Sequence, residues 1–287
     1  MTTVKNGSKG ADVKTLQEAL NKAGGYGLST DGIFGPKTEA AVKDFQKKKG
    51  LTVDGICGPI TWTVLGYNVP SNVPSNVPSS KCIDPSVVFM PLKVGLTQHK
   101  TKRTPKYLAI HYTAGSSSQV GNARKCYDTF VARCKTDKPG SADFAVDDKE
   151  MVQFNPDIEN YNCWAVGGDK NKYTSGGSLY GKASNSSTVS IEICSNRKGG
   201  TSNTAANHEG WYFTEAALNN AVKLAKLIMK KYNIPIDRVI RHYDVNGKLC
   251  PGVPGWNDEA LYTTGGTKTS TKCKSEKWQE FKKRLIQ

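Results

Sequence analysis

The sequence predicts two domains of different fold class. Residues 1–66 are expected to form a small all-α domain of three helices, and residues 81–287 an α/β domain with a mixed sheet covered by helices. Three observations predict this division: a motif that occurs twice near the N-terminus, a proline-containing linker over residues 67–80, and an alternation of strand-like and helix-like segments after it. Such alternation is typical of a sheet with helices packed on its faces.

The motif of the first domain is Asp-Gly-Ile-Phe-Gly-Pro-Lys-Thr at residues 31–38, which returns as Asp-Gly-Ile-Cys-Gly-Pro-Ile-Thr at residues 54–61. Each copy combines an Asp-Gly turn with a Gly-Pro step, and proline is tolerated in the first turn of a helix. A helix is therefore expected after each copy. Another is expected over residues 12–23, whose apolar side chains recur at helical spacing.

Three segments of the first domain carry family information: Gly-Ser-Lys-Gly at residues 7–10, the turn at residues 31–38, and Phe45-Gln46. Together they resemble the peptidoglycan-binding domain of many lysins, and the resemblance covers nearly all of residues 5–65. It implies attachment to the bacterial wall rather than catalysis. For the two Asp-Gly-Ile turns we expect a structural role, because Asp and Gly are favoured where the backbone turns tightly.

The linker at residues 67–80 contains Asn-Val-Pro-Ser three times in succession and no charged residue. Proline at every fourth position favours the extended polyproline conformation. The segment is therefore expected to act as a stiff spacer between the two domains.

The second domain combines short apolar strands with amphipathic helices. Strands are expected at residues 106–110, 144–146, 189–193 and 238–241. Helices are expected over residues 122–133, from the capping residue Thr214 to Pro235, and around Trp278, Phe281 and Leu285 near the C-terminus.

Two of the four histidines, His111 and His242, directly follow predicted strands. Ligand crevices form at strand ends in open α/β sheets, so these side chains are expected to converge. Cys250 lies in a turn shortly after His242. Two imidazoles and a thiolate suit zinc, and three protein ligands leave a fourth position open, as in catalytic zinc sites. Each residue taken alone also fits a surface or buried structural role.

Five segments around these residues occur in the order typical of one family. They are Ala-Ile-His-Tyr-Thr-Ala-Gly at 109–115, Phe-Ala-Val-Asp-Asp at 144–148, Ser-Ile-Glu-Ile-Cys at 190–194, Arg-His-Tyr-Asp at 241–244 and Gly-Lys-Leu-Cys-Pro at 247–251. They resemble the type 2 N-acetylmuramoyl-L-alanine amidases, relatives of the peptidoglycan recognition proteins. The resemblance implies that His111, His242 and Cys250 hold one Zn²⁺ ion. It also implies hydrolysis of the amide bond between N-acetylmuramic acid and L-alanine, as in a phage endolysin or an autolysin.

Two further residues have expected catalytic roles. Glu192 lies within an apolar strand, on the face opposite Ile191 and Ile193, where a carboxylate needs compensation. The resemblance implies that Glu192 is the general base and that Lys248, two positions before Cys250, stabilises the oxyanion. The alternatives are a glutamate satisfied by structural hydrogen bonds and a solvated loop lysine.

The chain departs from the family pattern in two places. Ala142 stands where many members have a tyrosine, and residues 162–167 lack a histidine that is frequent there. The main alternative function is a non-catalytic peptidoglycan recognition protein that binds the wall without cutting it. Relatives of that kind typically lack the ligand cysteine, whereas Cys250 is present here.

Charge and composition restrict the partners. The net charge of +15 favours polyanions, and anionic wall polymers are the expected partners besides peptidoglycan. The lysines are scattered and no recognition motif for nucleic acid occurs, so nucleic acid is not an expected partner. No apolar run reaches the roughly 18 residues of a membrane span.

The N-terminus and the cysteines bear on where the protein is made. Residues 1–10 are polar and lack the apolar core of a signal peptide. We therefore expect synthesis in the cytoplasm and action at the wall after release. The eight cysteines include no CxxC pair. Free thiols are the expected state in a reducing cytoplasm, with one cysteine as a possible ligand.

Overall fold

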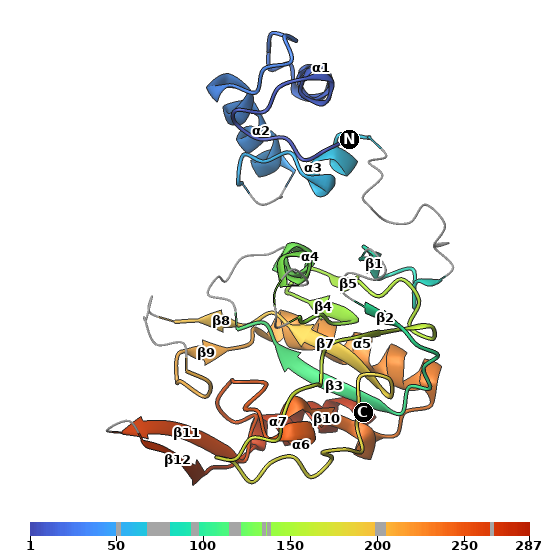
Figure 1. Ribbon diagram of the computed structural model, residues 1–287, viewed down its shortest axis with the longest axis vertical. Helices are drawn as coiled ribbons and strands as arrows, with labels where there is room; N and C mark the ends of the chain where they lie inside the picture. Colours follow the sequence, from blue (N-terminus) through green and yellow to red (C-terminus); the bar gives the residue numbers. More distant parts are fainter. Residues whose placement is uncertain are drawn as a thin grey trace. The chain divides into compact units, whose positions relative to one another are not determined.

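The computed structural model describes residues 1–49, 53–67, 81–92, 98–114, 122–133, 136, 139–198, 205–264 and 267–287. The chain divides into two compact units, residues 1–75 and 76–287 (Figure 1). The division falls within the expected linker, of which residues 68–80 lie outside the described residues. The exact domain limits and the stiffness of the linker therefore stay predictions.

The first unit contains the three expected helices: α1 (Ala11–Gly24), α2 (Pro36–Lys48) and α3 (Pro59–Val64). Each helix begins at the proline of its motif copy, Pro36 or Pro59, slightly earlier than the position after the copy that was expected. The apolar faces of the helices enclose one core that includes Leu16, Phe45 and Trp62. The all-α prediction for this unit is confirmed.

The two copies of the motif are held by the same set of hydrogen bonds. In the first copy, the Gln17 side chain donates to Asp31 Oδ1 at 2.9 Å and to the Ile33 carbonyl at 3.0 Å, and it accepts from the Gly32 amide at 2.9 Å. In the second copy, Gln46 makes the equivalent bonds to Asp54, Ile56 and Gly55. Each Asp-Gly-Ile turn is thus tied to the preceding helix, which is the structural role expected for it.

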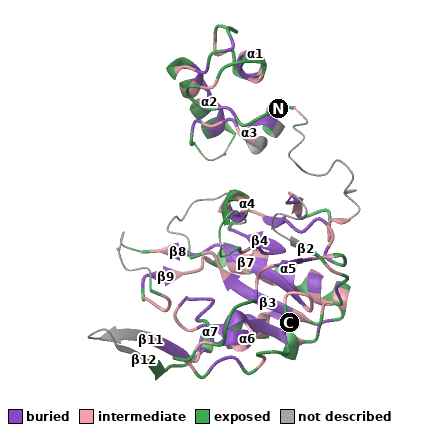
Figure 2. Cartoon of the chain, in the orientation of Figure 1, coloured by how far each residue is buried: buried purple, intermediate pink, exposed green. Residues whose placement is uncertain are grey.

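The second unit is built on a six-stranded sheet in the order β1-β5-β4-β7-β3-β10. Its strands are β1 (Val88–Phe89), β3 (Tyr107–Tyr112), β4 (Phe144–Val146), β5 (Met151–Gln153), β7 (Thr188–Ile193) and β10 (Val239–Arg241). Only β4 and β5 pair antiparallel, and the other neighbours in this sheet are parallel. The sheet is therefore mixed, as predicted, and its central strands are buried (Figure 2).

Helices pack on both faces of the sheet. On one face, α5 (Glu215–Tyr232) and α7 (Glu276–Ile286) share a core with alternate side chains of β3, β4 and β7. On the other face, α4 (Asn122–Arg133) packs against Ala145 and its neighbours. The strands alternate between the two faces, so His111 and Glu192 point away from the core formed with α5 and α7.

The ends of α5 follow local rules, with one correction. Thr214 caps the N-terminus, because its hydroxyl accepts a hydrogen bond from the Ala217 amide. The C-terminus was expected at Pro235, but α5 ends at Tyr232. Asn233 follows in the left-handed conformation, at φ 51°, and its amide donates to the Met229 carbonyl. Asparagine tolerates this conformation, so it ends the helix before the proline is reached.

Several elements were not predicted. The 3₁₀ helix η2 (Ile236–Arg238) precedes β10, and the short helix α6 (His242–Asn246) follows it. Three two-stranded ribbons pair β2 (Gln98–Lys100) with β6 (Tyr161–Cys163), β8 (Asn196–Arg197) with β9 (Trp211–Tyr212), and β11 (Glu259–Thr264) with β12 (Thr267–Lys272). Figure 1 shows the last two ribbons extending on the side where β3 ends.

A buried ion pair stabilises the middle of the sheet. Arg103 donates to Asp143 at 2.7 Å, and both side chains are almost fully buried. Asp143 also accepts hydrogen bonds from the amide and hydroxyl of Ser190, at 2.9 and 3.1 Å. Because Ser190 precedes Glu192 by two residues on β7, this network holds the strand that carries the predicted base.

The seven cysteines among the described residues are free thiols, and Cys134 lies outside those residues.

Within the part of the chain that the structure describes, no helix combines the length and the apolarity needed to cross a membrane.

Candidate metal centre

The structure brings three of the predicted site residues together. His111 was expected directly after a strand but lies within it, because β3 continues to Tyr112. His242 is the first residue of α6, directly after β10. The parallel pairing of β3 with β10 sets Ile110 opposite Arg241, so the two histidines reach the same edge of the sheet. The turn after α6 returns Cys250 to them. The potential ligand atoms of His111, His242 and Cys250 all lie within 4.8 Å of one another.

The geometry of this cluster fits a shared metal ion. Cys250 Sγ lies 3.6 Å from His111 Nδ1, and the centres of the two imidazole rings are 4.9 Å apart. Zinc bonds of about 2.0–2.3 Å would place two tetrahedral ligand atoms roughly 3.5 Å apart. The three side chains are 3–4% exposed.

Three of the four imidazole nitrogens of the cluster form no hydrogen bond with the described residues. His111 Nε2 and both ring nitrogens of His242 have no hydrogen-bond partner among the described residues. A buried polar atom without a partner is destabilising, and such atoms usually mark a bound ion, a water molecule or a functional role. A bound metal ion would satisfy one nitrogen of each ring.

Burial keeps all three ligands neutral in the metal-free protein. It holds the pKa of His111 well below its usual value, with the neighbouring His242 and Lys248 acting in the same direction. Burial and then Lys248 lower the pKa of His242 to about 3. Burial raises the pKa of the Cys250 thiol to about 12, and the Glu192 carboxylate adds to the rise. The imidazoles can therefore bind a cation without releasing a proton, whereas the thiol must first be deprotonated.

Glu192 lies beside this cluster. It is the register partner of His111 in the parallel ladder between β3 and β7. Its Oε2 atom is buried and has no hydrogen-bond partner among the described residues. Burial raises the pKa of Glu192 to about 7, against the opposing effects of Lys248 and Arg133. A carboxyl group with a pKa near neutrality can exchange a proton at physiological pH.

Lys248 lies on the exposed side of the same turn as Cys250. Its amide donates to Asn246 Oδ1 at 3.1 Å, which helps to hold the turn after α6. The positive charge of its ammonium group lowers the pKa values of His111, His242, Glu192 and Cys250.

A cleft of about 310 Å³ opens next to Lys248. Its lining residues are Tyr112, Asn171, Ala205, Ala206, Lys248, Leu249 and Leu261. Leu261 belongs to β11, and the Asn171 amide is fixed to the Asn246 carbonyl at 2.7 Å. Sequence reasoning missed Asn171 and Leu261, because no motif marks them and they reach the cleft only through tertiary packing.

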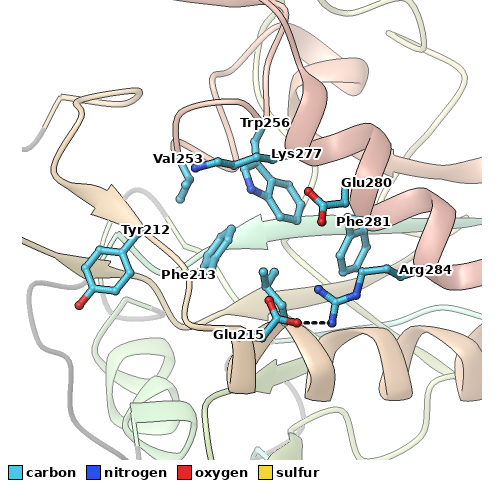
Figure 3. A pocket seen from close by; sticks show the side chains of 10 residues that line it. Tyr212, Phe213, Glu215, Val253, Trp256, Lys277, Glu280, Phe281 and Arg284 are labelled. Carbon is cyan, nitrogen blue, oxygen red and sulfur yellow. Dashed lines mark ion pairs between the residues drawn. The ribbon is translucent and has the colours of Figure 1, made fainter.

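A second hollow, of about 200 Å³, lies between α5, α7 and the segment after Cys250 (Figure 3). Val253, Trp256, Phe213 and Phe281 contribute its apolar wall. At its edge Arg284 pairs with Glu215 at 2.9 Å. None of the five predicted site residues lines it, so it is separate from the metal centre.

The remaining sequence features of interest lie outside the cluster. His208 is in a turn, where its Nδ1 accepts from the Gly210 amide, and the side chain of His99 lies outside the described residues. Ala142, where the sequence departs from the family pattern it resembles, is fully buried in the cluster that packs with α4.

Comparison with known proteins agrees with this arrangement. Residues 101–253 match the family model for N-acetylmuramoyl-L-alanine amidase, and residues 9–65 match that for a peptidoglycan binding domain. The amidase CwlL of Bacillus licheniformis is 28% identical over 187 residues, which cover 62% of this chain and 46% of that protein. The amidase CwlH of Bacillus subtilis is 31% identical over 147 residues, which cover 51% and 47%.

Among solved structures, a mutant endolysin from Bacillus subtilis is 25% identical, with a TM-score of 0.45, and the match covers 69% of this chain and 97% of that chain. The chain spans about half the length of the curated relatives it matches. The amidase family model covers more than half of the chain, and the chain therefore belongs to the N-acetylmuramoyl-L-alanine amidase family.

Proposed function

We propose that this protein is a zinc amidohydrolase that cuts the amide bond between N-acetylmuramic acid and L-alanine in bacterial peptidoglycan. One observation carries the proposal: three buried ligand atoms, from His111, His242 and Cys250, lie within 4.8 Å of one another. Membership of the amidase family agrees with it.

His111, His242 and Cys250 would hold the zinc ion. Two imidazoles and one thiolate form a typical set for a catalytic zinc site with an open fourth position. The bound ion would polarise the amide carbonyl and make a water molecule more acidic. The neutral state of both imidazoles, which follows from their lowered pKa values, favours binding at neutral pH.

Glu192 and Lys248 would carry the proton and charge changes of the reaction. With a pKa of about 7, Glu192 can accept a proton from the attacking water and return it to the leaving amine. Lys248 lines the cleft beside the cluster, where its ammonium group can stabilise the oxyanion that develops on the carbonyl oxygen.

The first unit would hold the enzyme on its substrate. Its match to a peptidoglycan binding domain supports binding to the glycan or peptide of the wall. Anionic wall polymers are a further proposed partner, because the chain carries a net charge of +15. The protein would then act at the wall after release from the cell that makes it.

Mass spectrometry of digested peptidoglycan tests the proposed reaction. Purified walls treated with the zinc-loaded protein should yield peptides with new L-alanine amino termini. Removal of zinc with a chelator should abolish the products, and added zinc should restore them.

Two other results would contradict the proposal. New reducing sugars in place of new amino termini would indicate a glycosidase. Tight binding to walls without any new chain end would indicate a non-catalytic recognition protein.

A further inference from the structure

The turn that carries Cys250 is held from outside by two asparagines. The side-chain amide of Asn257 donates a short hydrogen bond to the carbonyl of Pro251, the residue after Cys250. The backbone amide of Asn207 donates to the carbonyl of Gly252, the next residue, at 2.7 Å. Both carbonyls that follow Cys250 are thus fixed by residues outside the turn.

The two asparagines also contact each other and the cleft wall. Asn257 Nδ2 lies 3.3 Å from Asn207 Oδ1, and Asn207 Nδ2 donates to the Glu259 carbonyl at 2.5 Å. Asn207 has the left-handed conformation, at φ 64°. Glu259 begins β11, the strand that contributes Leu261 to the cleft. We call this set of hydrogen bonds the asparagine bracket.

Asn257 acts in the bracket through its donor. The residue is fully buried, and its Oδ1 atom has no hydrogen-bond partner among the described residues. A buried acceptor without a partner lowers stability. The contacts of this side chain are therefore made by its Nδ2 donor, which bonds to the Pro251 carbonyl and to Asn207.

Cys250 depends on such support more than the other two ligands do. His111 is fixed by the ladders of β3, and His242 by β10 and the first turn of α6. Cys250 lies outside any strand or helix. Its carbonyl accepts from the Tyr243 amide at 3.2 Å, which orients the residue from the side of α6. The Asn257 bond orients it from the other side.

We propose that Asn257 is a positioning residue for Cys250, whose side-chain amide holds the sulfur at the distance from the two imidazoles that a shared metal ion requires. The inference rests on the metal centre proposed above. Residues that orient metal ligands typically change metal affinity by about 10- to 100-fold when they are replaced.

The test measures metal binding rather than catalysis. In Asn257→Leu the shape of the side chain is kept and the donor is removed. We expect the zinc dissociation constant, measured by competition with a chromogenic chelator, to rise by about 10- to 100-fold. The sulfur-to-metal absorption band of the cobalt-substituted protein should weaken or shift. Asn257→Asp, which replaces the donor with an acceptor, should change both readouts in the same direction.

Asn155→Leu is the matched control. Asn155 is also a fully buried asparagine of this unit, and its side chain donates to Asp143 and to the Tyr161 carbonyl, within the network around Arg103. Its replacement should lower the melting temperature at least as much as Asn257→Leu does. The zinc affinity and the cobalt spectrum of the folded Asn155→Leu protein should match those of the wild type.

A third variant covers the case in which Asn257→Leu fails to fold. Asn207→Gly retains the backbone donor and accepts the positive φ, but it removes the bonds to Asn257 and Glu259. We expect a smaller rise in the zinc dissociation constant than Asn257→Asp causes.

Wild-type zinc affinity and cobalt spectra in the folded Asn257 variants and in Asn207→Gly would overturn the inference, as would an equal loss in Asn155→Leu. If the wild type itself bound neither metal, the proposed metal centre would fail instead.

Discussion

His111 and Glu192 are direct partners in the parallel ladder between β3 and β7. Side chains of paired residues project from the same face of a sheet. A potential metal ligand and a carboxyl group that titrates near neutrality are therefore set side by side by backbone pairing alone. The position of Glu192 relative to the cluster thus depends on strand register and not on a flexible loop.

Loss of the sulfur ligand should remove the metal. In Cys250→Ser we expect the bound zinc of the purified protein, measured by atomic emission, to fall to trace levels and the amidase rate to fall by more than about 100-fold. Cys82→Ser is the control, because within the described ranges the Cys82 thiol donates to the carbonyls of Asp84 and Val87, and a hydroxyl can make the same bonds. Full zinc content in Cys250→Ser would exclude Cys250 as a ligand.

The rate should depend on the ionisation of Glu192. A general base must be deprotonated, so kcat/KM should fall as the pH drops through the pKa of Glu192, which is about 7 in the metal-free protein. The positive charge of a bound metal lowers this pKa, so the limb should lie at or below pH 7 in the zinc enzyme. Glu192→Gln should lower the rate by about 10²- to 10⁴-fold and abolish the limb, with the zinc content unchanged. A retained acid limb in Glu192→Gln would assign the titration to another group.

Lys248 should have two separable effects. Lys248→Met should lower kcat by about 100-fold with little change in KM, because a charge that stabilises the oxyanion acts in the transition state. It should also move the acid limb to higher pH, since Lys248 lowers the pKa of Glu192. Lys248→Arg should keep the position of the limb. A rise in KM with kcat unchanged would instead assign Lys248 to substrate binding.

Metal binding should release the proton of the Cys250 thiol. At a pH roughly midway between the pKa of Glu192, about 7, and that of the Cys250 thiol, about 12, the carboxylate is already ionised and the thiol still carries its proton. Both imidazoles are neutral there because their pKa values are lowered. A water molecule on the open position of a catalytic zinc site has a pKa of about 7, so it would be ionised at this pH as well. Calorimetric titration with zinc in buffers of different ionisation enthalpy should therefore report about two protons released, one from the thiol and one from the water. Release of about one proton or fewer would mean that the thiol is not a ligand.

The two glutamine contacts of the first unit should be equivalent. Gln17→Leu and Gln46→Leu each leave a buried glycine amide without its side-chain acceptor, whereas the isoleucine carbonyl keeps a second donor, the Gly35 amide or the Thr61 hydroxyl. Each change should destabilise the unit by about 1–3 kcal/mol, measured by denaturant unfolding. Hydrolysis of a small soluble muramyl peptide by the second unit should be unaffected. Destabilisation by only one of the two variants would show that the repeated motifs are not structurally equivalent.

Much of the fold followed from local patterns. The amphipathic spacing of α1, α2, α5 and α7, the Thr214 cap and the alternation in β7 each depend on neighbours within a few residues, so they are readable along the chain. The mixed sheet was also predicted. The ribbons β8–β9 and β11–β12 were not, because their strands are short or polar and are stabilised mainly by pairing with each other.

By itself the sequence placed His111 and His242 at the ends of predicted strands with Cys250 in a turn shortly after, and the family resemblance added Glu192 and Lys248 to the expected site. Tertiary structure alone decided that Cys250 Sγ, 139 positions away from His111 in the chain, lies 3.6 Å from its Nδ1. It also decided the raised pKa of Glu192, the cleft walls at Asn171 and Leu261, and the bond from Asn257 to Pro251. The physical reason is the distance along the chain over which each effect acts. Helical and strand periodicity depend on residues a few positions apart. Desolvation and contacts between distant segments arise only when the whole sheet and its helices have packed.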